Sequence, residues 1–426
     1  MTSEPRANEA YVWLWLPGTT DPVVAGRLAH TRDGRLAFNY GQSYLARDNA
    51  IAIYDPELPL RAGAIRTNTK MQLPSSIRDG SPDAWGRRVI INRLTGLKRE
   101  GAAHADLDEL TYLLESGSDR VGMLDFQQSP THYTARQHRN ASLEELMQSA
   151  ERVEKGVQLT PELDQALQHG SSLGGARPKA LIDDGERKYI AKFSAPSDLY
   201  NVVKAEFVAM RLAHSVGLTV APVKLASALG KDVLMIERFD RTAKNRTWMR
   251  HGIVSALTLL SLDEMEARYA SYEELATIVR HRFLDPAQTL AELFARMTFN
   301  ILCGNTDDHA RNHAAFWNGT SLRLTPAYDI CPQGRTGGEA TQAMLILGDR
   351  RKSQLSLCLE AASAFLLHGD RARAIVAHQV EVIKSDWART CDEAGLSEVD
   401  RAFLWRRQFL NPYAFEGITD PLLTAT

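Results

Sequence analysis

An aspartate and an asparagine five positions apart are the residues of this chain best suited to chemistry. Asp307 and Asn312 lie in the stretch GNTDDHARN, which follows an apolar pattern typical of a buried helix. In a protein-kinase catalytic loop, the same spacing separates the Asp that accepts a proton from the substrate hydroxyl and the Asn that holds magnesium. Asp329 follows seventeen residues after Asn312, about where a second metal-binding Asp is expected. This spacing predicts phosphoryl transfer.

The residues between Asp307 and Asn312 leave alternatives open. Asp308 competes for the catalytic role, but only Asp307 has the five-residue offset. His309 either orients the loop or contacts phosphate, and otherwise it is a packed loop histidine. A D-x-x-x-x-N spacing often arises by chance, and Asp329 can instead cap a turn. The pair therefore gains its meaning from the rest of the chain.

A second stretch, GSSLGGARPK at 170–179, has the composition of a phosphate-binding loop. Its small residues would let backbone N–H groups approach phosphate oxygens, and Lys179 adds a positive charge. The stretch is neither a Walker A sequence nor a kinase G-x-G-x-x-G. Taken alone, it is better explained as a flexible loop after a helix end, but the Asp307–Asn312 pair downstream favours the phosphate-binding interpretation.

A lysine and a strand end complete the candidate site. Lys192 ends a predicted strand and is similar to the kinase strand lysine that contacts ATP phosphates and pairs with a helix glutamate. Glu206 lies fourteen residues on, in an amphipathic helix pattern. The alternatives are a solvent-facing lysine and a helix-surface charge. Glu237–Phe239 falls where strand is expected to give way to helix, and its backbone groups are candidates for contacting adenine; an ordinary salt-bridged connector is the alternative.

Composition and charge narrow the class of protein. The 426 residues are 44% hydrophobic and 24% charged, which is ordinary for globular proteins, and the formal net charge is −2. A nucleic-acid-binding protein usually carries a basic excess, so we expect DNA binding to be local or to occur through a partner. The four cysteines contain no C-x-x-C pair, and no apolar run approaches the ~20 residues of a membrane span. A cytoplasmic protein without a membrane segment is expected.

Local patterns predict three regions. Residues 1–130 read as a small α+β unit, in which Ser81-Pro82-Asp83 opens a helix. Residues 131–240 read as a β-rich lobe with strands at Lys179–Ile182 and Lys188–Phe193 joined by an Asp-Asp-Gly turn. Residues 241–426 read as helical from the start, with one inserted hairpin. The order is that of an α+β, two-lobed, protein-kinase-like fold with an extra N-terminal subdomain.

Four stretches carry a closer resemblance. SLGGARPK (172–179), ERFDR (237–241), NTDDHARN (305–312) and PAYD (326–329) resemble the HipA family of serine/threonine kinase toxins of bacterial type II toxin–antitoxin systems. DRVG (119–122) is similar to the D-R-x-G turn of that family. The resemblance covers roughly Trp13 to Leu410, nearly the whole chain.

The resemblance implies a role for each matched position. Asp307 would be the catalytic base, Asn312 and Asp329 the Mg²⁺ ligands, and His309 a nucleotide contact. The residues implied to bind ATP are Gly174, Gly175, Ala176, Arg177, Pro178, Lys179, Lys192, Glu237, Arg238 and Phe239, with His309, Asn312 and Asp329. Ser172 aligns with a serine that the family autophosphorylates to silence itself, and Ser171 is the adjacent alternative. Two added negative charges there would repel nucleotide phosphates.

The resemblance also implies function and partners. The expectation is an ATP- and Mg²⁺-dependent serine/threonine kinase that inhibits growth by phosphorylating a translation component such as an aminoacyl-tRNA synthetase. It implies a HipB-like antitoxin that binds DNA as a dimer, so that DNA contact is mainly through the antitoxin. Two other hypotheses remain: a small-molecule phosphotransferase, which can share the D-x-x-x-x-N loop, and a non-catalytic corepressor that acts only with an antitoxin.

Overall fold

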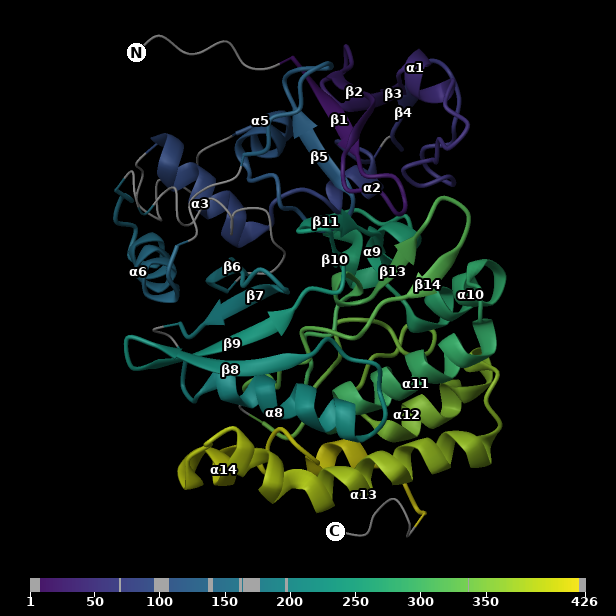
Figure 1. Cartoon of the computed structure of the whole chain (residues 1–426). Helices are drawn as coiled ribbons and strands as arrows, with labels where there is room; N and C mark the ends of the chain where they lie inside the picture. Colours follow the sequence, from purple (N-terminus) through teal and green to yellow (C-terminus); the bar gives the residue numbers. More distant parts are fainter. Residues whose placement is uncertain are drawn as a thin grey trace. The chain divides into compact units, whose positions relative to one another are not determined.

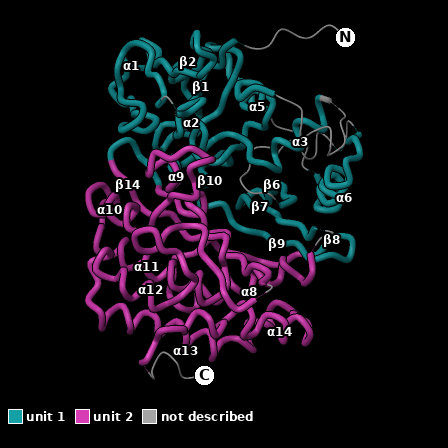
Figure 2. The backbone as a smooth tube through the Cα atoms, turned by 180° about the vertical axis from the view of Figure 1, so that it is seen from behind, with its two compact units in different colours: residues 1–195, 227–254, 316–320 teal, residues 196–226, 255–315, 321–426 magenta. Residues whose placement is uncertain are grey.

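The computed structural model describes residues 8–68, 70–95, 107–136, 141–160, 163, 177–195, 198–335 and 337–420. The chain forms two compact units, each built from several chain segments (Figure 2). Unit 1 comprises residues 1–195, 227–254 and 316–320, and unit 2 comprises 196–226, 255–315 and 321–426.

An antiparallel sheet forms the N-terminal part of unit 1, with the strand order β4-β3-β2-β1-β5 (Figure 1). Its strands are β1 (Glu9–Leu14), β2 (Val23–His30), β3 (Leu36–Tyr40), β4 (Ile65–Arg66) and β5 (Leu124–Gln127). The described helices that accompany it are α1 (Gln42–Leu45), α2 (Ser75–Arg78), α3 (Ala84–Thr95) and α5 (Glu109–Glu115). Val12, Leu28 and Phe38 are fully buried in this part of unit 1.

A second sheet has the strand order β6-β7-β9-β8. Its strands are β6 (Lys179–Asp183), β7 (Lys188–Phe193), β9 (Lys231–Glu237) and β8 (Val223–Ala228), within which the chain passes from unit 2 into unit 1. Along β7, buried residues alternate with partly exposed ones, as expected for a strand with one face in the core. The predicted β6–β7 hairpin is confirmed. The Ser142-Leu143-Glu144-Glu145 stretch has the sequence of a capping box, and such a box starts α6 (Leu143–Glu154).

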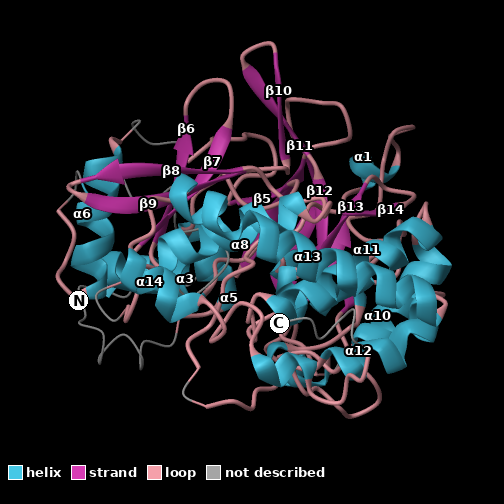
Figure 3. Cartoon of the chain, turned by 90° about the horizontal axis from the view of Figure 1, so that it is seen from below, coloured by secondary structure: helices cyan, strands magenta, loops and turns pink. Residues whose placement is uncertain are grey.

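The expectation that the chain turns helical from Arg241 is wrong. Two strands, β10 (Arg241–Lys244) and β11 (Thr247–Arg250), form an antiparallel hairpin that is visible in Figure 3. Asn245 and Arg246 between them have φ values of 51° and 63°. Two successive left-handed residues match the strand twist of a two-residue hairpin, and Asn is a favoured residue there. Asn245 was therefore a turn signal, but a weak one, because Arg246 follows it where glycine is usual.

A short three-stranded sheet has the order β12-β13-β14. Its strands are β12 (Gly252–Ser255), β13 (Ala314–Trp317) and β14 (Leu322–Leu324), and the unit boundaries fall within β12 and β13. The inserted hairpin that was predicted in this region is confirmed as β13 and β14, at 314–317 and 322–324.

Unit 2 is mainly helical. Its helices are α8 (Val202–Ser215), α9 (Ala256–Leu259), α10 (Tyr272–Arg282), α11 (Pro286–Leu302), α12 (Leu355–Glu360), α13 (Gly369–Glu393) and α14 (Glu398–Leu404), with 3-10 turns η2 (Glu264–Tyr269), η3 (Ala310–Asn312), η4 (Ala361–Phe365) and η5 (Pro412–Phe415). The long α13 packs against α8 and α11 (Figure 1). Leu290, Phe294 and Ile301 on α11 are fully buried, so this helix is the core of the unit. Among the described helices, none combines the length and the apolar character that crossing a bilayer requires.

Candidate functional site

The end of α11 sets the direction of the Asp307 loop. After the last helical residue, Gly304 has φ +72°, and its N–H donates to Ile301 O at 3.2 Å. The N–H of Asn305 reaches back to Asn300 O at 2.8 Å. These two bonds form a Schellman motif, which satisfies carbonyls at the helix end and reverses the chain. A Cβ on residue 304 would lie 2.7 Å from Gln408 O, so both the backbone angle and the close approach require glycine.

Asn305 joins this helix end to the segment that carries Asp329. Its Nδ2 donates to Asn300 Oδ1 at 3.0 Å and lies 3.5 Å from Asp329 O. The segment before Asp329 is held on the other side, because Ala327 N–H donates to Thr219 O at 2.7 Å. Two loops that are distant in sequence are therefore fixed by the same few bonds.

Asp307, Asn312 and Asp329 are gathered in unit 2. Burial raises the pKa of Asp307, and the negative charges of Asp329 and Asp308 raise it further, although the His309 charge opposes them. Asn312 is buried, and its Nδ2 donates to the backbone oxygen of Asp307 at 3.3 Å. Asp329 has φ +59°, a left-handed conformation that is uncommon for a residue with a side chain and occurs often at functional sites.

Asn312 and Asp329 fit a magnesium site. The Nδ2 of Asn312 donates to the backbone oxygen of Asp307, so Oδ1 would be its ligand atom, and Asp329 would add a carboxylate. The repulsion between Asp307 and Asp329 is what a divalent cation would relieve. Among the described residues, no group of three or more His, Cys, Asp or Glu side chains is arranged to hold a metal. A two-residue set is nevertheless suitable for Mg²⁺, which takes its other ligands from phosphates and water.

Asp308 has a different role from its neighbour. Its carboxylate accepts a hydrogen bond from the Tyr272 hydroxyl and lies 3.0 Å from His313 Nε2, with all three residues buried. Burial would raise the pKa of Asp308, but His313 and the Tyr272 hydrogen bond together lower it. Burial raises the pKa of Tyr272 well above its usual value, and the negative charge of Asp308 raises it further. Asp308 thus anchors the loop inward, which leaves Asp307, partly exposed, as the candidate base.

His309 follows Asp308 on the same loop. Its Nδ1 is buried and has no hydrogen-bond partner within the described part of the chain. A buried ring nitrogen without a protein partner is costly unless a ligand or water satisfies it. The unsatisfied Nδ1 agrees with a nucleotide contact by His309, but that contact stays a prediction.

The two candidate lysines lie side by side in unit 1. Lys179 on β6 pairs across the sheet with Lys192 on β7, so both side chains project from one face. The Lys179 ammonium is buried and 3.0 Å from Asp83 Oδ2. Lys192 pairs on its other side with Leu234 of β9. Asp83, which the sequence predicted only as a helix start, was not recognised as a partner of Lys179.

The strand end at Glu237–Phe239 is braced from the N-terminal sheet. Glu237 forms an exposed ion pair with Arg187 at 2.6 Å, and Arg238 N–H continues the β7–β9 ladder by donating to Lys188 O at 2.8 Å. The Arg238 side chain is buried against Asp119 at 3.1 Å. Arg238 was predicted as a contact through its backbone alone, and its buried side-chain ion pair was not predicted.

Further ionic contacts complete the network, which we call the hinge network and define as Asp119, Lys188, Arg238, Asp240 and Arg241. Arg238 and Arg241 each reach Asp240 Oδ2 at 2.8 Å, and Arg241 lies 2.9 Å from Asp119. Lys188 also pairs with Asp119. Burial alone would raise the pKa of Asp240, but Arg238 and Arg241 lower it to about 2.

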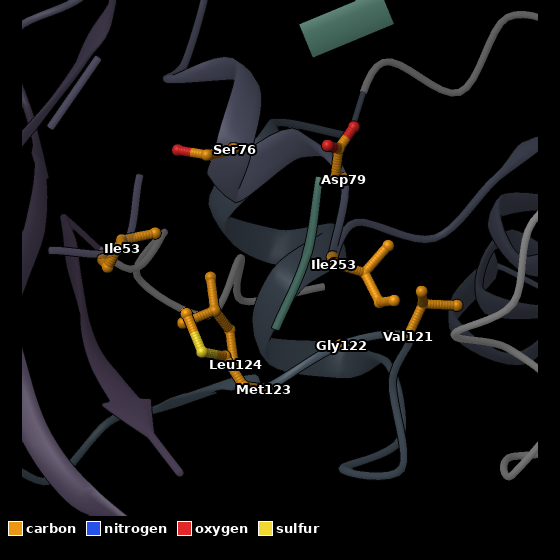
Figure 4. A pocket seen from close by; sticks show the side chains of 9 residues that line it. Ile53, Ser76, Asp79, Val121, Gly122, Met123, Leu124 and Ile253 are labelled. Carbon is orange, nitrogen blue, oxygen red and sulfur yellow. The ribbon is translucent and has the colours of Figure 1, made fainter. Parts of the chain in front are cut away.

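A small pocket adjoins the turn at Val121–Leu124 (Figure 4). It is lined by Ile53, Ser76, Asp79, Gly80, Val121, Gly122, Met123, Leu124 and Ile253. The lining is mostly apolar, and only Ser76 and Asp79 contribute polar side chains. We assign this pocket no role in the chemistry.

Part of the predicted phosphate loop lies outside the described residues. This applies to Gly174, Gly175, Ala176 and both candidate phosphorylation serines, Ser171 and Ser172. Arg177 and Pro178 are described, and Pro178 O accepts from Phe193 N–H at 3.1 Å, which continues the β6–β7 ladder.

Comparison with known proteins agrees with this fold. A HipA chain from a Shewanella oneidensis MR-1 complex of HipA, HipB and operator DNA has the same fold, with a TM-score of 0.66 at 18% identity over 93% of both chains. The fold is therefore α+β and kinase-like. The sequence matches the HipA N-terminal domain over residues 18–127. It also matches the HipA-like C-terminal domain over residues 171–387, and this second match alone covers about half of the chain. This protein belongs to the HipA family.

Curated relatives match over shorter stretches. A putative kinase, Y4mE, of Sinorhizobium fredii is 29% identical over 175 residues, which is 37% of this chain and 41% of the relative. The serine/threonine-protein kinase toxin HipA of Shewanella oneidensis is 26% identical over 183 residues, 37% of this chain and 42% of the relative. The matched part spans less than half the length of these two relatives.

Proposed function

We propose that this protein is a Mg²⁺- and ATP-dependent serine/threonine protein kinase that inhibits bacterial growth. The observation that carries the proposal is the gathering of Asp307, Asn312 and Asp329 around the end of α11, with the pKa of Asp307 raised by burial and by Asp329. Membership of the HipA family, and the kinase names of the curated relatives, support the same activity.

Asp307 is the catalytic base of the proposed reaction. The pKa of Asp307 is raised, and a carboxylate with a raised pKa accepts a proton more readily. Asp307 would take the proton from a substrate hydroxyl as the hydroxyl attacks the γ-phosphate and ADP leaves. Asn312 and Asp329 would hold Mg²⁺, which would offset the negative charge of the ATP phosphates. The anchor of Asp308 on Tyr272 and His313 keeps the loop in place during this step.

The proposal also assigns nucleotide-binding groups. Lys192 and Lys179 would offset phosphate charge, the backbone of Glu237–Phe239 would contact adenine, and residues 174–178 would contact phosphate. The adjacency of the two lysines on one sheet face supports this assignment. We also propose the division into an N-terminal subdomain (1–130), a nucleotide-binding lobe (131–240) and a C-terminal lobe (241–426).

The proposed partner is a HipB-like antitoxin, through which the protein would contact DNA. The structural relative was solved as a complex with HipB and operator DNA, and the net charge of −2 suits a chain that leaves DNA contact to a partner. The proposed target is a translation component such as an aminoacyl-tRNA synthetase, and Ser172, or Ser171, is the proposed site of silencing autophosphorylation.

Labelled ATP and bacterial lysate test the activity. Wild-type protein is expected to label a small number of lysate proteins, and Asp307→Asn to reduce labelling by about 10³-fold or more because the base is removed. Rapid turnover of a small alcohol without labelled protein would instead identify a small-molecule phosphotransferase. The matched control is Asp285→Asn, since Asp285 is exposed in the same unit.

Induced expression tests the toxin role. Growth is expected to stop with wild type and to continue with Asp307→Asn. Equal toxicity of the two would reject catalysis as the mechanism and favour a non-catalytic corepressor. Mass spectrometry after prolonged incubation with ATP is expected to find phosphate on Ser172 or Ser171; unmodified serines would reject the silencing step.

A further inference from the structure

Lys179 and Lys192 face each other at an unusually close register position. Phe193 N–H donates to Pro178 O, so the neighbouring pair, Lys179 and Lys192, is a non-hydrogen-bonded pair of the antiparallel ladder. Side chains approach most closely at such pairs, and like charges directly opposite are destabilising. A sheet that keeps two lysines there needs a negative group to compensate them.

Asp83 supplies one such group from a distant part of unit 1. Its Oδ2 lies 3.0 Å from Lys179 Nζ, although the two residues are 96 positions apart. The Lys179 side chain is only 2% exposed and that of Asp83 13%. The other carboxylate oxygen, Oδ1, accepts from Gly86 N–H at 2.7 Å and so caps the first turn of α3. One carboxylate therefore ties the start of a helix to a strand lysine.

Trp85 holds the same lysine by its backbone. In a non-hydrogen-bonded pair, the Lys179 carbonyl points away from β7, toward the outer edge of β6. The indole N–H of Trp85, a fully buried residue, donates to this carbonyl at 3.1 Å. The start of α3 thus contacts Lys179 at its side chain and at its main chain, beside the sheet edge (Figure 1).

Such a double hold matters for a group that must meet phosphate. A long lysine side chain loses rotamer entropy when it is fixed, so an ammonium fixed before binding costs less to recruit than a mobile one. In kinases the strand lysine, here predicted to be Lys192, is held in this way by a helix glutamate. Lys179 is a second lysine, and the carboxylate next to it comes from the N-terminal part of the chain.

We propose that Asp83 is a positioning residue of the nucleotide site. It holds the Lys179 ammonium toward the phosphates of a bound nucleoside triphosphate, and the N-terminal subdomain thereby takes part in nucleotide binding. This inference rests on the proposed kinase function. The competing explanation is that the pair only stabilises the packing of α3 on the sheet.

Two substitutions separate the ion pair from the helix cap. Asp83→Asn and Asp83→Ser both keep an oxygen acceptor for Gly86 N–H, and both remove the charge beside Lys179. Asp83→Glu keeps the charge on a longer side chain and tests rescue. The control is Glu109→Gln. It removes the ion-pair partner of Arg87, a residue of α3, at 2.8 Å and leaves Lys179 untouched.

The measurement is the dissociation constant of the full-length protein for ATP with Mg²⁺ and, by competition, for adenosine, together with the KM for ATP and kcat. For Asp83→Asn and Asp83→Ser, we expect ATP to bind about tenfold more weakly and adenosine as tightly as in wild type, because only the phosphate contacts are affected. KM should rise more than kcat falls, and Asp83→Glu should restore part of the ATP affinity.

Unchanged ATP affinity in Asp83→Asn, or equal weakening of ATP and adenosine, would overturn the inference. If both charge-removing variants fail to fold by circular dichroism, Asp83→Glu decides: selective weakening of ATP supports positioning, and wild-type affinity rejects it. A wild-type protein that neither binds ATP nor transfers phosphate would reject the proposed function itself, which is a different outcome from a failure of Asp83 alone.

Discussion

At the residue scale, the two adjacent aspartates of the loop are separated by their surroundings. Asp308 is 3% exposed and fully engaged with Tyr272 and His313, while Asp307 is partly exposed and repelled by Asp329. A buried carboxylate must be compensated by hydrogen bonds, and a base must reach its substrate. The division of roles follows from which carboxylate is paired.

Removing the Tyr272 hydroxyl tests this anchor. In Tyr272→Phe, Asp308 loses one of its two described partners, so we expect the free energy of unfolding to fall by about 1–3 kcal/mol. We also expect kcat to fall more than the KM for ATP changes, because the loop positions the base. Denaturant unfolding and steady-state kinetics measure both.

Tyr269→Phe is the matched control, since Tyr269 is 54% exposed on the neighbouring 3-10 turn. A Tyr272→Phe protein as stable and active as this control would show that the hydroxyl does not anchor the loop.

At the element scale, the hinge network ties β9 and β10 to the Asp119–Gly122 turn. Arg238 and Arg241 are each 1% exposed, and both contact Asp119 and Asp240. In a low-dielectric site, removing one partner leaves the other charge uncompensated, which costs about 3–5 kcal/mol. The strand end that is proposed to hold adenine is therefore rigid for electrostatic reasons.

Acid unfolding tests the charge of this network. The pKa of Asp240 is lowered to about 2, against about 4 in an unfolded chain, so between these values the unfolded state binds more protons. The stabilisation is complete above about pH 4 and is lost as the pH falls toward 2. We expect Asp240→Asn to unfold more easily at pH 7 and to show a flatter loss of stability between pH 4 and 2.

The exposed Asp21→Asn variant of the same unit should keep the wild-type profile. If Asp240→Asn and wild type lose stability in parallel below pH 4, the ionised Asp240 does not stabilise the fold.

At the scale of the whole molecule, the chain forms two units from interleaved segments, and its thiols belong to one of them. Cys303, Cys331, Cys358 and Cys391 are all buried and all lie in unit 2. Burial raises the pKa of Cys303 to about 12 and that of Cys391 to about 11. Because the thiolate is the reactive form, these groups should be inert in the folded protein.

Alkylation with iodoacetamide at pH 8 measures the reactivity of the four thiols. We expect essentially no labelling of native protein within the time that labels all four thiols in denaturant, with mass spectrometry as the readout. The appearance of alkylated cysteine should then report the unfolding of unit 2. Rapid native labelling of Cys303 would contradict its burial.

Much of the local structure was predictable because the signals are local. Ser142 begins α6 with a capping box, and the Asp-Asp-Gly turn joins β6 and β7. The strands at 241–255 were missed because they are short and their turn, Asn245-Arg246, has no glycine. A turn in which a non-glycine residue adopts positive φ gives only a weak sequence signal.

The sequence by itself determined the spacing of Asp307 and Asn312 and the helix end at Gly304, since both depend on neighbours within a few residues. Only the tertiary structure decided which partners the charged groups meet. Asp308 finds Tyr272 36 positions away, and Lys179 finds Asp83 96 positions away. These pairs form because a buried charge without a partner is too costly in a folded core. A single sequence does not show which distant residues come close together.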